Sequence, residues 1–217
     1  TLAGKTLTLH CPNTGSMKNC MVEGSPCWYS LSDKIDRKLP GTLELVTTSA
    51  GNLAGVNTIH ANKIVLEAIS DGRIEPLSCY SKIYKEVRYG DENSRIDLLL
   101  EGANQSCFVE VKNVTLDMGN GLALFPDSVT SRGSKHLREL IRIVASGRRS
   151  VLFFCVQLSG VDRLGVASDI DSEYSKNLHQ AIESGVEVMA WKCELSSSSV
   201  RISRPIKFLY DTVKSQM

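Results

Sequence analysis

Two carboxylates and a lysine interrupt a pair of apolar, strand-like runs near the middle of the chain. Asp97 lies in the first run, and Glu110 and Lys112 lie in the second, which begins after a turn at residues 102–106. Because side chains alternate along a strand, Glu110 and Lys112 share one face, roughly 7 Å apart. Antiparallel pairing through the turn would bring Asp97 beside Glu110. Two oxygen ligands and a cation are what Mg²⁺-assisted phosphodiester hydrolysis needs, so these residues are a candidate metal site.

The same residues allow a second interpretation. An uncompensated carboxylate in a half-buried strand is costly, and Asp is a poor strand former, so both acids must be paired, solvated or metal-bound. Glu110 and Lys112 could form an ion pair on one face of the strand, with Asp97 near a strand end. The spacing leaves both interpretations open, and the order of the surrounding elements favours the metal site.

Hydrophobic periodicity predicts an α/β chain with a mixed sheet around these residues. Helical spacing of apolar residues predicts three helices, at 60–70, 131–146 and 171–184. Apolar or alternating runs predict five strands, at 83–89, 95–101, 107–114, 151–158 and 186–191. The first three strands form a meander. The order α-β-β-β-α-β-α-β places the acids on its second and third strands.

Basic residues gather on the second predicted helix, although the whole chain has a net charge of only +1. Lys135, Arg138 and Arg142 share one helical face, and Arg132 lies in the first turn. This face is either plain solvated surface or a phosphate-binding surface. Its position directly after the strand of Glu110 favours phosphate binding, because a helix N-terminus attracts anions. The predicted DNA-binding residues are Arg132, Lys135, His136, Arg138 and Arg142, with His136 a polar partner at that end of the helix.

Five separated blocks of sequence carry a family resemblance. They are LTLHCPNTGSM (7–17), VNT (56–58), EVRYGDENSRIDLLL (86–100), VEVKNVTL (109–116) and FPDSVTSRGSKHLREL (125–140). Together they resemble the sugar fermentation stimulation protein (SfsA) family, and the acid-lysine motif resembles the PD-(D/E)xK nuclease superfamily. The resemblance implies an N-terminal OB-like β-barrel at 1–57 and a restriction-endonuclease-like α/β domain at 58–217. It also implies DNA binding without strong sequence selectivity and a link to maltose metabolism.

The resemblance assigns roles to particular residues. Asp97, Glu110 and Lys112 take the catalytic positions, and Asp97 and Glu110 would bind Mg²⁺ or Mn²⁺ with Glu67 as a third acid. No organic cofactor is expected. Ile96 stands where the superfamily motif has proline, which leaves the chemistry unchanged. The chain opens inside what looks like a β-hairpin, so we expect an early strand of the barrel to be missing.

Composition adds three expectations. No apolar run approaches the length of a membrane span, and we expect a cytoplasmic protein with no membrane partner. The seven cysteines are odd in number and contain no CxxC pair, so buried free thiols are expected, with a zinc site at Cys11, Cys20 and Cys27 as an alternative. Trp28 either fills the core of the barrel or stacks on a base.

Two classes of function fit these observations. In the first, the protein is a Mg²⁺-dependent nuclease that uses Asp97, Glu110 and Lys112. In the second, it is a non-catalytic DNA-binding regulator of sugar (maltose) metabolism that has kept the nuclease scaffold. The partner is nucleic acid in both cases, with DNA preferred over RNA. The clustered acids favour the nuclease, and the family description favours the regulator.

Overall fold

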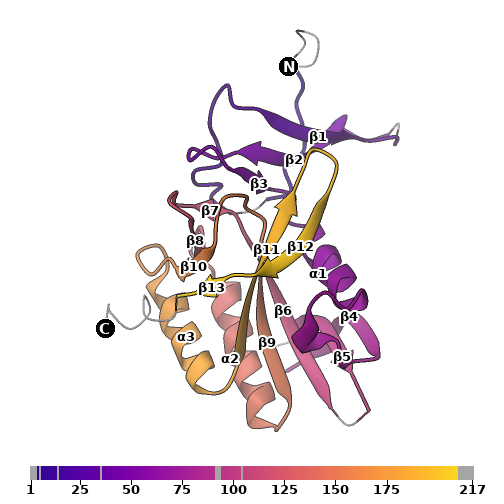
Figure 1. Ribbon diagram of the computed structural model, residues 1–217, viewed down its shortest axis with the longest axis vertical. Helices are drawn as coiled ribbons and strands as arrows, with labels where there is room; N and C mark the ends of the chain where they lie inside the picture. The colour runs from indigo at the N-terminus through magenta and orange to yellow at the C-terminus, as the bar shows by residue number, and fades with distance from the viewer. Residues whose placement is uncertain are drawn as a thin grey trace.

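A six-stranded mixed β-sheet forms the centre of the computed structural model, which describes residues 4, 6–13, 15–34, 36–90, 94–103 and 105–209 (Figure 1). In spatial order its strands are β12 (Val200–Pro205), β11 (Glu187–Leu195), β9 (Arg149–Val156), β6 (Ser106–Val114), β5 (Ser94–Glu101) and β4 (Lys82–Tyr89). β4, β5 and β6 pair antiparallel, as the predicted meander requires. β6, β9 and β11 then run parallel, and β12 returns antiparallel along the edge.

Three α-helices flank this sheet, and each lies where the sequence predicts it. They are α1 (His60–Ser70), α2 (Ser131–Ala145) and α3 (Ser172–Glu183), with a short 3₁₀ helix, η1 (Glu75–Leu77), after α1. The Thr130 side chain caps α2 by accepting a hydrogen bond from the Gly133 N–H, and Asp171 caps α3 in the same way through Tyr174. α2 ends where Gly147 takes a positive φ of 78°.

The helices divide into two layers. α2 and α3 cover one face of the sheet and α1 covers the other (Figure 1). Along β6, Cys107, Val109 and Val111 pack in the cluster on the α1 side, while Phe108 packs in the cluster on the α2 side. The predicted alternation of β6 is therefore confirmed, and Glu110 belongs to the α2 side.

β5 departs from regular alternation at Asp97. Ile96 packs on the α2 side of the sheet, whereas Leu98 packs on the α1 side, although residues two apart in a strand normally share a face. Pairing of β5 with β6 runs from Glu101 to Leu98, which lies opposite Val109. The next positions in this register are Asp97 and Glu110, so the sheet opens where the two acids lie.

Two smaller sheets complete the fold. An N-terminal sheet contains β1 (Cys27–Leu31), β2 (Gly41–Thr47) and β3 (Leu53–Gly55). The second sheet contains β13 (Lys207–Phe208), β10 (Arg163–Val166), β8 (Leu122–Phe125) and β7 (Leu116–Asp117). This second sheet has no periodic signal in the sequence, because strands of two to four residues are too short to show a period.

The N-terminal sheet is bonded to the end of β9. The backbone N–H of Gly55 donates to the Gln157 carbonyl at 2.9 Å, and the N–H of Leu53 donates to Oγ of Ser159 at 2.8 Å. A second connection joins the loop before β1 to the loop before α2, where the Met17 N–H donates to Oδ2 of Asp127 at 3.2 Å. These bonds fix the N-terminal domain against the larger one.

Other expectations have mixed outcomes. Cys20, Cys107, Cys155 and Cys193 are buried free thiols, but Cys11, Cys27 and Cys79 are exposed. Among the helices of the described ranges, none has the length and apolarity to cross a bilayer. Two predictions fall partly on residues outside the described part of the chain. Asn104 of the predicted turn at 102–106 is one such residue, and residues 1–3 and 5 of the predicted opening hairpin are the others.

Candidate metal and nucleic-acid site

Two hydrogen bonds, one from β6 and one from α1, fix the carboxylate of Asp97 at the opening in the sheet. Its Oδ2 accepts a hydrogen bond of 2.7 Å from the backbone N–H of Val111 on β6. Its Oδ1 accepts one of 2.7 Å from Nδ2 of Asn62 on α1. The side chain is half-buried. The interruption of β5 thus leaves a carboxylate where the strand ladder would otherwise continue.

Glu110 is the most deeply buried acid of this group, with 2% of its surface exposed. Its Oε1 accepts hydrogen bonds from Nζ of Lys112, at 2.7 Å, and from Nδ1 of His136. Its Oε2 is buried and has no hydrogen-bond partner among the described residues. A buried carboxylate oxygen without a hydrogen-bond donor is costly, and a cation bound to Oε2 would offset that cost.

The hydrogen-bond partners of His136 define its tautomer. Nε of Arg132 donates to Nε2 of His136 at 3.4 Å, so Nε2 is the acceptor and Nδ1 carries the proton given to Glu110. Nζ of Lys112 lies 3.3 Å from the same Nδ1 but donates to Glu110 instead. His136 therefore orients the Glu110 carboxylate and links it to Arg132 at the start of α2.

The two acids differ in their protonation behaviour. Burial, followed by the negative charge of Glu110, raises the pKa of Asp97 to about 6. Burial also acts to raise the pKa of Glu110, but the charge of Lys112 and the hydrogen bond from His136 outweigh it, so that pKa lies below its ordinary value. Glu110 is therefore ionised at neutral pH, and its charge disfavours ionisation of Asp97. A cation between the two carboxylates would relieve this repulsion.

The donor set fits a hard divalent cation. It offers the orphaned Oε2 of Glu110 and the carboxylate of Asp97, and carboxylate oxygen is the preferred ligand of Mg²⁺. Within the described ranges, no three His, Cys, Asp or Glu side chains converge as a metal-binding group. A cation here would therefore complete its coordination with water, backbone or substrate oxygens, as Mg²⁺ commonly does.

The structure does not bring Glu67 to the other two acids. Its side chain is 57% exposed and forms an ion pair of 3.0 Å with Arg73. Asn62 is the residue of α1 that contacts Asp97, and it was not among the predicted site residues. In the sequence, Asn62 differs in no way from the other polar residues that flank the buried apolar residues of α1, so no pattern marks it as a site residue.

The predicted DNA-binding residues separate into two groups. His136 is buried, with 5% of its surface exposed, and its ring is bonded to Glu110, so it is a polar partner inside the site and does not lie on the exposed helix surface. Arg132 and Arg138 are exposed and Lys135 is half-buried. Arg142 forms an ion pair of 3.1 Å with the buried Glu139, which offsets part of its charge.

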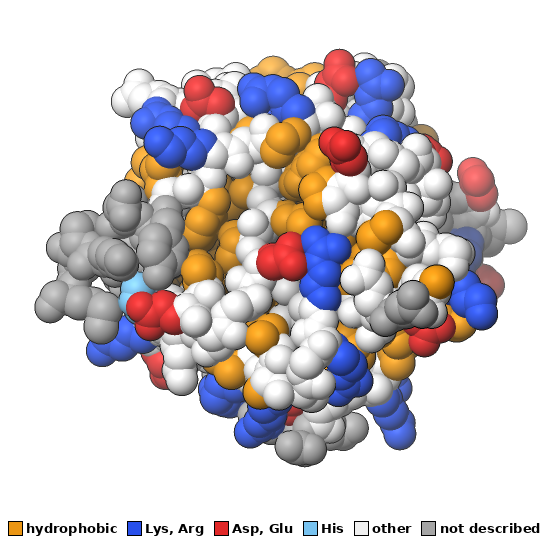
Figure 2. Space-filling view, turned by 60° about the horizontal axis from the view of Figure 1, so that its bottom comes forward, with side chains coloured by type: hydrophobic (Ala, Val, Ile, Leu, Met, Phe, Trp, Pro, Cys, Tyr) orange, Lys and Arg blue, Asp and Glu red, His pale blue; other side chains and the backbone are white. Residues whose placement is uncertain are grey.

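Positive charge is not concentrated on the face of the molecule that Figure 2 shows. On the face shown in Figure 2, Lys and Arg side chains lie scattered around a middle region where hydrophobic side chains gather, and acidic side chains lie among them. This distribution agrees with the net charge of +1. The exposed Arg132 and Arg138 lie in the first two turns of α2, the helix whose His136 contacts Glu110.

Comparisons with known proteins match both parts of the chain. A family model described as the SfsA N-terminal OB domain matches residues 1–56, and one described as the sugar fermentation stimulation protein RE domain matches residues 59–199. A sugar fermentation stimulation protein homolog of Saccharophagus degradans is 48% identical over 204 residues, covering 94% of this chain and 88% of that protein. The homolog of Teredinibacter turnerae is 52% identical over 200 residues, covering 92% of this chain and 85% of that protein.

A solved structure shares the fold. The structure of Pyrococcus furiosus SfsA in complex with Ca²⁺ matches with a TM-score of 0.84 and 24% sequence identity, covering 95% of this chain and 87% of that chain. The fold is therefore a mixed α/β arrangement with an N-terminal OB domain followed by a restriction-endonuclease-like domain. The prediction of fold class is confirmed.

Proposed function

Because the chain belongs to the sugar fermentation stimulation protein family, with its restriction-endonuclease-like domain, we propose that it binds DNA and cleaves phosphodiester bonds with a divalent cation. The catalytic residues of this proposal are Asp97, Glu110 and Lys112. The observation that carries it is the buried Oε2 of Glu110, which has no hydrogen-bond partner among the described residues and belongs to a carboxylate beside Asp97 and Lys112.

Each residue of the proposed site has a separate task. Asp97 and Glu110 would hold the cation, Mg²⁺ or Mn²⁺, and the cation would supply activation of a water molecule and polarisation of the phosphate. Lys112 is 14% exposed, and it places a positive charge where negative charge develops on the phosphate oxygens. His136 and Asn62 are positioning residues, because they contact the two acids rather than the reacting atoms.

The first two turns of α2 supply the contacts to the nucleic-acid backbone in this proposal. Arg132 and Arg138 are exposed, and Arg132 reaches back to His136 through Nε, which leaves its other nitrogens for a phosphate. These contacts do not read bases, so binding by this surface is independent of sequence.

One property of a relative supports a metal-dependent function, and a second property of the family favours the alternative. The similar Pyrococcus furiosus protein is described in complex with Ca²⁺, a hard cation that prefers the same oxygen ligands as Mg²⁺. The name of the family refers to stimulation of sugar fermentation, which favours the second candidate, a DNA-binding regulator of sugar (maltose) metabolism without turnover.

A cleavage assay separates the two candidates. Wild-type protein is incubated with supercoiled, linear and single-stranded DNA, and with RNA, in Mg²⁺, Mn²⁺ or EDTA. We expect cleavage that needs the cation and is lost in Asp97→Asn and Glu110→Gln. Glu194→Gln is the matched control, because Glu194 is an exposed acid paired with Arg201 on the β11–β12 hairpin. Binding without cleavage in every condition would favour the regulator and remove the nuclease.

A further inference from the structure

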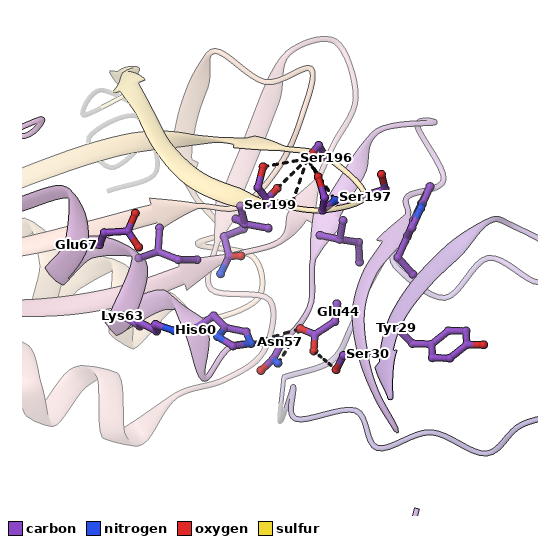
Figure 3. Close-up of a pocket in the computed structure, with 16 residues that line it drawn as sticks. Tyr29, Ser30, Glu44, Asn57, His60, Lys63, Glu67, Ser196, Ser197 and Ser199 are labelled. Carbon is purple, nitrogen blue, oxygen red and sulfur yellow. Dashed lines mark hydrogen bonds and ion pairs between the residues drawn. The ribbon is translucent and has the colours of Figure 1, made fainter. Parts of the chain in front are cut away.

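A cavity of about 440 Å³ lies between the N-terminal domain and the larger domain, apart from the acid cluster. Its walls come from β1 and β2 on one side and from α1 on the other, and the serine turn between β11 and β12 closes the top in Figure 3. His60, Lys63 and Glu67 line it from α1, whereas Asn62 contacts Asp97. α1 is therefore a shared wall between two separate sites.

A hydrogen-bond network fixes the polar groups at the base of this cavity. Oε1 of Glu44 accepts from Oγ of Ser30 at 2.7 Å, and its Oε2 accepts from Nδ2 of Asn57 at 2.8 Å. Nε2 of His60 lies 3.5 Å from the same Oε2. Figure 3 shows Glu44 at the centre of this group.

The network leaves one polar atom without a partner. Because Nδ2 of Asn57 donates to Glu44, the amide cannot be flipped, and Oδ1 is its only remaining acceptor. Asn57 is 7% exposed, and its Oδ1 has no hydrogen-bond partner among the described residues. Asn57 lines the cavity, and its unpaired Oδ1 is a buried acceptor that an N–H or O–H donor of a ligand would satisfy.

The other lining residues narrow the chemistry of that ligand. Trp28 is half-buried and borders the cavity, so its indole offers an aromatic face for stacking. Lys63 is exposed on the α1 wall and can reach a phosphate. An anionic group beside Glu44 is disfavoured, because the Glu44 carboxylate would repel it.

We propose that this cavity binds a nucleotide, with its base stacked on Trp28, a base amino or ring N–H group donating to Asn57, and its phosphate near Lys63. The inference rests on the proposed nucleic-acid binding and adds a preference for unpaired bases. A base within a duplex cannot enter such a cavity without leaving the stack, whereas a single strand offers it freely. The same chemistry is available from a free nucleotide, and the test distinguishes the two sources.

The test measures binding in EDTA, so that cleavage does not interfere. Fluorescence anisotropy gives the Kd of a labelled single-stranded 12-mer and of the matching duplex for the wild type, Trp28→Leu, Trp28→Phe and Asn57→Leu. Tyr84→Leu is the control, because Tyr84 is a 42% exposed aromatic residue on β4, outside the cavity. AMP, CMP and maltose are titrated separately while tryptophan fluorescence is followed; Trp191, the other tryptophan, is buried.

We expect Trp28→Leu and Asn57→Leu to weaken single-strand binding by about 5-fold to 100-fold while duplex binding stays within about 2-fold of wild type. Trp28→Phe should keep most of the affinity, because it keeps the stacking face. Quenching by AMP or CMP would identify free nucleotides as a source, and an effect confined to the 12-mer would identify the bases of a strand.

Several results would overturn the inference while leaving the proposed function in place. These are unchanged single-strand binding in both cavity variants, an equal loss for single strand and duplex, or quenching by maltose and by no nucleotide. Wild-type protein that binds neither oligonucleotide and neither nucleotide would overturn the inference and the proposed function together.

Discussion

The backbone N–H of Val111 donates a hydrogen bond of 2.7 Å to Oδ2 of Asp97 across the opening between β5 and β6. Val111 lies between Glu110 and Lys112 in the chain, so this bond fixes the acid of one strand to the strand that carries the other two residues. A carboxylate that replaces a carbonyl of the ladder keeps the N–H satisfied while the sheet opens. This contact therefore links the two strands that carry the candidate site.

The raised pKa of Asp97 has a consequence for stability. With a pKa of about 6 in the folded protein, Asp97 binds its proton more tightly than an unfolded Asp, whose pKa is about 4, so stability is lost as the pH rises from about 4 to about 6. Asp97→Asn cannot ionise there. The free energy of unfolding of Asp97→Asn minus that of the wild type should therefore be larger at pH 7.5 than at pH 4, by about 1–2 kcal/mol. This amount is kept low because Asp97 is half-buried. Urea denaturation at both pH values measures this change, and a constant difference would contradict it.

His136 should act on metal binding through Glu110. His136→Ala removes the donor to Oε1 of Glu110, and we expect metal affinity to fall by about 10-fold to 100-fold. His136→Asn places an amide N–H near the former Nδ1 and should restore most of the affinity. Calorimetric titration with Mn²⁺ gives both values. Equal affinity in wild type and His136→Ala would assign the histidine to packing alone.

Lys112 should separate catalysis from metal binding. Its charge is not a metal ligand, so Lys112→Ala is expected to keep the bound cation and to lose cleavage by about 100-fold or more. Single-turnover cleavage rates and Mn²⁺ titration on the same preparation measure the two effects. Loss of the cation together with the rate would instead show that Lys112 is needed to assemble the site.

If the basic surface of α2 binds DNA, it should contribute to the salt dependence of DNA affinity. If Arg132, Lys135 and Arg138 contact phosphates, replacing all three with alanine should weaken DNA binding for every sequence tested. The slope of log Kd against log salt concentration should fall by roughly one per lost contact. Lys176→Ala on α3 provides a control for the removal of a surface charge. A triple variant with an unchanged slope would identify this surface as ordinary solvated helix.

Much of the larger domain could be predicted from the sequence, because its elements are long and periodic. α1 begins and ends at the predicted residues, and β4, β5 and β6 form the predicted meander. The β7, β8, β10 and β13 strands have too few residues to show a period, and β12 follows a serine turn and ends in Pro205.

The candidate site was only partly predictable, for a physical reason. Strand parity indicates which face Glu110 and Lys112 share, but it does not show which helix residue lies above them. His136 was predicted among the DNA-binding residues, as a polar partner at the start of the helix, and the sequence did not indicate that this partner is Glu110. Asn62 and Asn57 act through contacts with residues distant in the chain, and no local pattern marks such contacts.

Direct titration of divalent cation tests the central claim, that Asp97 and Glu110 form one metal site. Wild-type protein, Asp97→Asn, Glu110→Gln and the control Glu194→Gln are titrated with Mn²⁺ and Mg²⁺ at pH 7.5 and again at pH 5.5. We predict one site per chain in the wild type and the control, weaker at pH 5.5 because Asp97 must lose its proton to bind. The site should be absent in both acid variants. Undiminished binding in Glu110→Gln, or a wild type that binds neither cation at either pH, would contradict the account.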